Sequence, residues 1–199
     1  MNYISDILFM ISTGLLIPVV VLLIFFFLRA LLLVINFFAQ FQSAAKTSAT
    51  LSKELDNLTV ENFASLQERL PKKSKALAII YLNKLIDAKD SEAKREKILN
   101  EYEIAVSADI STSKTLSKMG PMLGLMGTLI PMGPALVGLS TGDISTMAYN
   151  MQVAFATTVV GLFAAAIGFI TQQTKQRWYK RNLSSLEFVS QFISENFGK

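Results

Sequence analysis

Three long runs of apolar residues alternate with mixed polar stretches along the chain. The runs cover residues 7–38, 119–139 and 147–171, and within them the only charged residue is Arg29. A helix needs about 20 mainly apolar residues to cross roughly 30 Å of hydrocarbon, and each run reaches that length. The pattern therefore predicts an all-α integral membrane protein with three transmembrane helices.

The first run leaves two features open. Gly14 and Pro18 loosen its outer end, so the span begins near Ile7 or Leu15. At the inner end, either the hydrocarbon stops at Arg29, or the helix continues to residue 38 and the guanidinium reaches back to the headgroups. We favour the second interpretation because residues 30–38 remain strongly apolar. The run lacks a basic leader and a small-residue cleavage signature, so we expect a retained span.

The polar stretch from 42 to 118 has apolar residues at helical spacing, which predicts amphipathic helices. Pro71 marks a turn, and Asp90–Ser91 resembles a helix cap with Glu92 in the first turn. No helix breaker follows before Gly120–Pro121, so this helix should run straight into the second span. The apolar positions are Leu51, Leu55 and Leu58, then Leu66 and Leu70, then Leu77, Ile80, Leu85 and Ile86.

The tail continues the same pattern after the third run, so we expect a helical extension of that span. Its apolar positions are Leu183, Leu186, Val189, Phe192, Ile193 and Phe197.

Basic residues are distributed unevenly, and this predicts the orientation. The segment 42–118 carries 13 of the 19 Lys and Arg residues and the tail carries five, whereas residues 1–28 and 140–146 carry none. By the positive-inside rule, the N-terminus and the short loop face outward, and the middle and the tail are cytoplasmic. The predicted segments are 1–6 (outer N-terminus), 7–38 (span one), 39–118 (cytoplasmic), 119–140 (span two), 141–146 (outer loop), 147–172 (span three) and 173–199 (cytoplasmic tail).

Composition narrows the class of protein further. The chain has 51% hydrophobic and only 17% charged residues, and it contains no Cys and no His. Disulfides, Cys/His metal sites and serine–histidine catalysis are thereby excluded. Because no carboxylate pair or nucleophile–base set lies at membrane depth either, we expect no enzymatic activity and no cofactor or metal. The tail's basic cluster is also compatible with binding phospholipid headgroups.

Small residues recur along one face of each of the last two spans, which predicts a tightly packed helical hairpin. Membrane threonines most often return their hydroxyl to a carbonyl one turn earlier, so spacing alone favours packing over a polar path. The face of span two contains Gly120, Gly124, Gly127, Thr128, Pro131 and Ala135, and that of span three contains Ala154, Thr158, Gly161, Ala165 and Gly168, with Thr157 beside it.

Two short motifs on this hairpin resemble a known family. Gly-Leu-Met-Gly-Thr at 124–128 is followed by Ala-Thr-Thr-Val-Val-Gly-Leu at 156–162. Together with the topology, they resemble the MotA/TolQ/ExbB proton-channel family, which carries Gly-Leu-x-Gly-Thr and Thr-x-x-Gly elements in these spans. The middle segment is nearer in length to the TolQ/ExbB type than to flagellar stators, but residues 130–134, Ile-Pro-Met-Gly-Pro, are not assigned to either branch, and the subtype stays open.

The resemblance implies a homopentamer in the bacterial inner membrane that encloses a dimer of a single-span ExbD/TolR/MotB-like partner. Thr128 and Thr158 would be the polar threonines of the ion path, with Thr157 as a neighbour. Spans two and three contain no charged or titratable Asp, Glu, His, Lys or Arg, so the carboxylate that an ion path usually needs must come from that partner. Ion flow would then produce mechanical work.

A different class of function stays open at this point. The small-residue faces are also compatible with a non-energised oligomeric scaffold that docks a cytoplasmic partner. The sequence does not separate H⁺ from Na⁺, nor does it identify the load.

Overall fold

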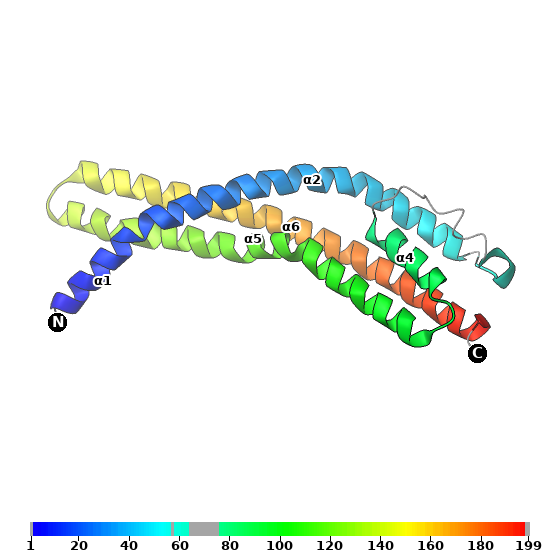
Figure 1. Cartoon of the computed structure of the whole chain (residues 1–199). Coiled ribbons are helices and arrows are strands. Elements are labelled where there is room, and N and C mark those ends of the chain that lie inside the picture. Colours follow the sequence, from blue (N-terminus) through cyan, green and yellow to red (C-terminus); the bar gives the residue numbers. More distant parts are fainter. Residues whose placement is uncertain (1, 57, 64–75, 198–199) are drawn as a thin grey trace. The chain divides into compact units, whose positions relative to one another are not determined.

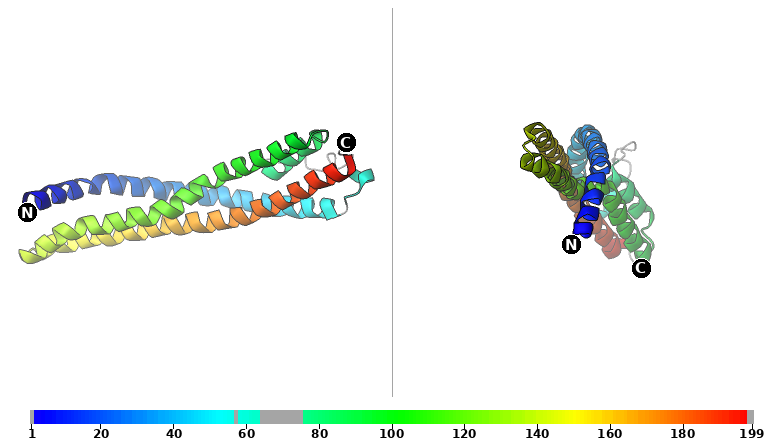
Figure 2. Two further views of the ribbon diagram at one scale, coloured as in Figure 1. Left: turned by 90° about the horizontal axis from the view of Figure 1, so that it is seen from below. Right: turned by 90° about the vertical axis from the view of Figure 1, so that its left-hand side faces the viewer.

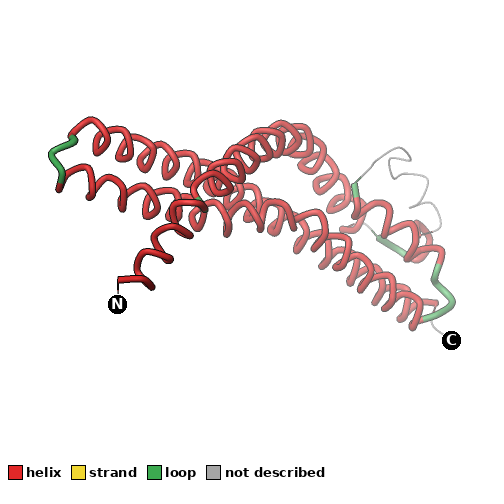
Figure 3. The backbone as a smooth tube through the Cα atoms, turned by 60° about the vertical axis from the view of Figure 1, so that its left-hand side comes forward, coloured by secondary structure: helices red, strands yellow, loops and turns green. Residues whose placement is uncertain are grey.

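The computed structural model describes residues 2–56, 58–63 and 76–197, and the side chains of all of these except residues 2, 42–50, 52 and 56. Every regular element in that part is an α-helix (Figures 1 and 3). The elements are α1 (Asn2–Gly14), α2 (Leu16–Asp56), α4 (Leu77–Asp87), α5 (Glu92–Ser140) and α6 (Ile144–Phe197).

Three helical stretches are long and apolar enough to cross a membrane: Tyr3–Phe41, Glu92–Ser140 and Ile144–Phe197. They contain the three apolar runs of the sequence, so the prediction of an all-helical membrane protein with three candidate spans is confirmed. The helix also continues through Arg29 beyond residue 38. The first stretch is interrupted by a turn at Leu15, because Pro18 cannot donate a hydrogen bond to the Gly14 carbonyl.

Helix α5 begins where the sequence predicts. The Ser91 hydroxyl accepts a hydrogen bond from the Lys94 amide at 3.4 Å, the position of a helix N-cap. The helix then continues for 49 residues without a break, although Pro121, Pro131 and Pro134 lie inside it. Each proline leaves the carbonyl four residues earlier without its usual donor, but packing against neighbouring helices holds the helix together.

The chain divides into two compact units. The hairpin unit comprises Met1–Ile35 and Thr112–Thr171, and the bundle unit comprises Asn36–Ser111 and Gln172–Lys199. In the hairpin unit, α5 and α6 run side by side and antiparallel, joined by a tight turn with Gly142 at a positive φ of 77° (Figure 2). The first part of α2 packs on this pair through Val19 and Leu23, which cluster with Leu123 of α5.

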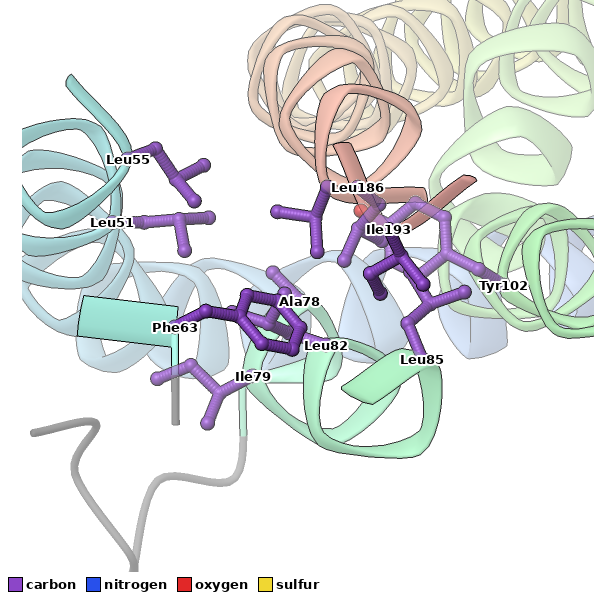
Figure 4. Close-up of a cluster of buried hydrophobic side chains, with 11 residues drawn as sticks. Leu51, Leu55, Phe63, Ala78, Ile79, Leu82, Leu85, Tyr102, Leu186 and Ile193 are labelled. Atoms are coloured by element: carbon purple, nitrogen blue, oxygen red, sulfur yellow. The ribbon is translucent and has the colours of Figure 1, made fainter. Parts of the chain in front are cut away.

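The bundle unit has its own hydrophobic core (Figure 4). Side chains from α2, α4, α5 and α6 meet in it and leave almost no surface exposed. The buried members are Leu51, Leu55, Phe63, Ala78, Ile79, Leu82, Leu85, Tyr102, Leu186, Val189 and Ile193.

Two positions of the predicted apolar stripes are exposed, namely Phe197 in the tail, at 37%, and Ile80 on α4. Ile80 was expected on the buried face of its helix, but it is 41% exposed, and Ala78 and Ile79 are buried in its place. The buried face of α4 therefore follows 78/79, 82 and 85, because the helix meets the bundle on the side of Leu82 and Leu85. The predictions for Leu66, Leu70 and Pro71 lie outside the described residues.

Candidate functional site

The small residues that are predicted to pack between α5 and α6 all belong to the hairpin unit. None of the nine predicted packing positions is exposed, and the glycines among them are in contact across the helix pair. The buried positions are Gly120, Gly124, Gly127, Pro131 and Ala135 on α5, and Ala154, Gly161, Ala165 and Gly168 on α6.

The two helix backbones touch at the centre of this contact. A methyl group added at Gly161 would lie 2.7 Å from the Gly120 carbonyl oxygen and 2.9 Å from the Gly124 Cα atom. The contact is reciprocal, since a methyl group on Gly120 would lie 2.7 Å from the Gly161 carbonyl oxygen. Atoms of the backbone cannot rotate out of the way, so only glycine fits at these positions.

The close approach continues towards both ends of the hairpin. A methyl group on Gly168 would lie 2.7 Å from the Ser117 amide nitrogen and 2.8 Å from the Ser113 carbonyl oxygen. Nearer the loop, a methyl group on Gly127 would lie 2.5 Å from the Thr157 hydroxyl oxygen. The side chain of Thr157 therefore fills the notch that Gly127 leaves open.

The structure places the three threonines differently. Thr157 is buried, and its hydroxyl donates to the carbonyls of Val153 and Ala154 at 3.0 and 2.9 Å. Thr128 and Thr158 are partly exposed, and their hydroxyls donate within their own helices: Thr128 to Leu125 O at 2.7 Å and Thr158 to Ala154 O at 3.1 Å.

The spacing of α6 contained a signal for the burial of Thr157. The buried positions 154, 157, 161, 164, 168, 171 and 175 alternate steps of three and four residues, and this stripe passes through Thr157 rather than Thr158. Thr157 lies three residues after position 154 and Thr158 lies four residues after it, so a helical step from that position reaches either threonine. The prediction of Thr158 on the packing face, with Thr157 beside it, follows from the step of four.

Asp143 is the only charged residue between Lys118 and Lys175, and it lies in the exposed turn of the hairpin. Its carboxylate accepts a hydrogen bond from the Thr146 amide at 3.0 Å, so it caps the start of α6. Hydrogen bonds from the Thr146 side chain and amide lower the pKa of Asp143. The role that this geometry supports is that of an ionised helix cap.

The bundle unit contains a buried polar network that the sequence did not reveal. Lys175 is only 4% exposed, and its ammonium lies 2.8 Å from Asp109 Oδ2. The Tyr179 hydroxyl donates to the same oxygen at 2.6 Å. Burial, together with the hydrogen bond to Asp109 and its negative charge, raises the pKa of Tyr179, and burial raises the pKa of the neighbouring Tyr102 to about 12.

The position of Lys175 could have been found from the sequence, but its partner could not. Lys175 continues the three-and-four spacing of the buried stripe on α6, so a polar partner was required. Asp109 is one of several acidic residues on α5, and only the folded structure shows which of them faces the lysine.

Comparison with known proteins gives one positive result. A family model described as the MotA/TolQ/ExbB proton channel family matches residues 62–187, which is more than half of the chain. No curated protein matches the chain. The matched range includes all of α5 and the whole of the hairpin between α5 and α6.

The glycine contact predicts the effect of one methyl group. Gly161→Ala should lower the stability of the protein by about 1–3 kcal/mol, because the two backbones must move apart. Gly14→Ala is the matched control, since a methyl group there meets no atom within 4 Å. Thermal unfolding in detergent measures both variants. Equal midpoints for Gly161→Ala and the unmodified protein would show that the helices are not in backbone contact.

The buried ion pair predicts an asymmetric double-mutant cycle. Asp109→Leu alone should cost about 3–5 kcal/mol because it leaves the Lys175 ammonium buried without its partner, whereas adding Lys175→Met should restore most of that loss. Chemical unfolding followed by circular dichroism measures the cycle. The exposed pair Lys97–Glu101, at 3.7 Å, is the control, and its double replacement should change stability by less than about 1 kcal/mol. A double variant no more stable than Asp109→Leu would contradict the assignment.

Proposed function

The chain belongs to the MotA/TolQ/ExbB proton channel family, and on this basis we propose that it forms the wall of an ion-driven motor in the bacterial inner membrane. Five copies would surround a dimer of a single-span ExbD/TolR/MotB-like protein. Ion flow between the wall and that dimer would turn one against the other, and the outer part of the partner would transmit the work. The N-terminus would face outward and the C-terminus the cytoplasm, as the distribution of Lys and Arg favours.

The observation that carries this proposal is a hairpin whose two spans carry no charged side chain and present hydroxyl groups. Residues 119–142 and 144–174 contain no Asp, Glu, His, Lys or Arg, so spans two and three of this chain offer no carboxylate, imidazole or basic group. A path for H⁺ or Na⁺ through hydrocarbon usually needs such a group. The wall is therefore incomplete by itself, which favours a partner that supplies a membrane carboxylate.

The hydrogen bonds define what the two partly exposed threonines offer. Because the hydroxyl hydrogens of Thr128 and Thr158 are used within their own helices, each oxygen keeps a lone pair as an acceptor. Such an oxygen accepts a hydrogen bond from a protonated carboxyl group or a hydronium ion, and it also ligates Na⁺. To bind an ionised carboxylate, the hydroxyl must first leave its helical carbonyl. The two states of the partner's carboxyl group would thus contact the wall differently.

Thr157 has a separate role in this proposal. Its side chain is buried against Gly127, so it holds α5 and α6 together at the level of the ion path without lining the path. Thr128, which follows Gly127 directly, depends on this contact for its position along α5. The proposed ion-path residues are therefore Thr128 and Thr158, and Thr157 is a positioning residue.

The incomplete wall predicts low conduction by the chain alone. The protein reconstituted in liposomes with an entrapped pH-sensitive dye should show proton flux near that of empty liposomes. The complex isolated from native membranes, with its partner identified by mass spectrometry, should conduct when the partner's membrane carboxylate is intact. The same measurements with a Na⁺ gradient determine the ion. Strong flux through the chain without a partner would refute the proposal, and a complex that never conducts would favour the scaffold function.

The assignment of the threonines predicts a pattern among three isosteric variants. Thr128→Val and Thr158→Val in the complex should reduce ion flux about 10-fold or more, because each loses a hydrogen bond to a charged species while volume is kept. Thr157→Val should leave flux nearly unchanged. Thr141→Val, in the exposed turn, is a further control. Retained assembly is checked by size-exclusion chromatography, and full flux in both of the first two variants would contradict the polar path.

A further inference from the structure

One face of α6 carries a cluster of positive charge just beyond the third apolar run. Arg177, Lys180 and Arg181 are all exposed, and their spacing of three and four residues puts them on the same side of the helix. We call these three residues the cationic stripe. No Asp or Glu occurs on α6 before Glu187, so no acidic residue of this helix lies within the stripe or on the turns that precede it.

The stripe is not neutralised within the described part of the chain. Ion pairs in this part of the chain join Lys84 and Lys97 to Glu101, and Lys175 to Asp109, and none of these pairs includes a residue of the stripe. Lys175 makes an instructive contrast, since it lies two residues before Arg177 but points inward to a carboxylate. On the same helix, therefore, one cation is buried and paired with a carboxylate, and the three cations of the stripe are exposed.

Aromatic residues mark the depth of the stripe. Trp178 is the only tryptophan of the chain, and its ring stacks on Phe37 of α2 at 5.7 Å with an interplanar angle of 5°. Phe41 packs on the same indole at 5.5 Å. Tryptophan is enriched where hydrocarbon meets water. Since the predicted third span ends at residue 172, Arg177 follows about 8 Å further along the helix, which is headgroup depth.

We propose that the cationic stripe binds the phosphate groups of anionic phospholipids in the membrane leaflet at this end of the spans. Two arginines can each hold a phosphate through paired hydrogen bonds, and the lysine adds a third charge. An anionic lipid fits this depth better than an acidic polypeptide, because a lipid also places acyl chains against the aromatic cluster. The inference rests on insertion in a membrane and not on ion conduction.

The single tryptophan makes the site measurable. The purified full-length protein is reconstituted in phosphatidylcholine bilayers that contain a fraction of phosphatidylglycerol, and either lipid is brominated near the headgroup end of its chains. Bromine quenches Trp178 fluorescence only from nearby lipids. Brominated phosphatidylglycerol should quench more strongly than brominated phosphatidylcholine, with a relative association constant of about 5-fold per cation engaged. Arg177→Gln/Lys180→Gln/Arg181→Gln should abolish the difference.

Matched variants decide whether the cationic stripe causes the preference for phosphatidylglycerol. Lys89→Gln/Lys94→Gln/Lys97→Gln removes the same charge from exposed positions around the start of α5 and should keep the preference for phosphatidylglycerol. Arg177→Lys/Arg181→Lys keeps the positive charge of the stripe and should retain most of the preference for phosphatidylglycerol. Circular dichroism checks that each variant is folded. Equal quenching by both lipids in the unmodified protein, or an equal loss in both triple variants, would overturn the proposal.

Discussion

The contact between the backbones of α5 and α6 at Gly120, Gly124 and Gly161 is the constraint on which the hairpin depends. Within a membrane, lipid tails are as apolar as leucine, so exclusion of water does not drive two helices together. Association then relies on dispersion contacts, and these fall away steeply with distance. Only the absence of side chains at these glycines allows the two helices to approach closely enough.

This contact also determines what the hairpin shows to its surroundings. Because the glycines, the alanines and Pro131 of the predicted faces are buried, the remaining outer surface consists mostly of large apolar side chains such as Leu125, Leu129 and Phe155. Thr128 and Thr158 are the partly exposed hydroxyls at the level of the family motifs. A surface of this kind is compatible with lipid or with apolar helices, and it offers an ion little beyond these oxygens. The scarcity of polar groups on the outer surface of the hairpin is thus a consequence of its packing.

Much of the architecture could be predicted from the sequence, for identifiable reasons. Membrane spans are set by the length of apolar runs, and the start of α5 by the side chain of Ser91, both of which are local properties. Predictions failed or stayed ambiguous where they had to decide which of two adjacent residues of a helix is buried. This was the case for Ile80 and its neighbour on α4, and for Thr157 and Thr158 on α6. The pairing of Lys175 with Asp109 depends on which faces of two distant segments meet, and a single sequence does not contain that information.

The distribution of charge along α6 connects packing to the position of the membrane. A cation at this depth needs either a carboxylate partner or contact with water and headgroups. Lys175 has the first, since its ammonium lies 2.8 Å from Asp109, whereas Arg177 has no partner among the described residues and is exposed. Burying the end of α6 more deeply would desolvate Arg177, and raising it would expose apolar residues of the third span to water. These two costs oppose each other, so the exposed cation and the apolar run together limit how far α6 can shift along the membrane normal.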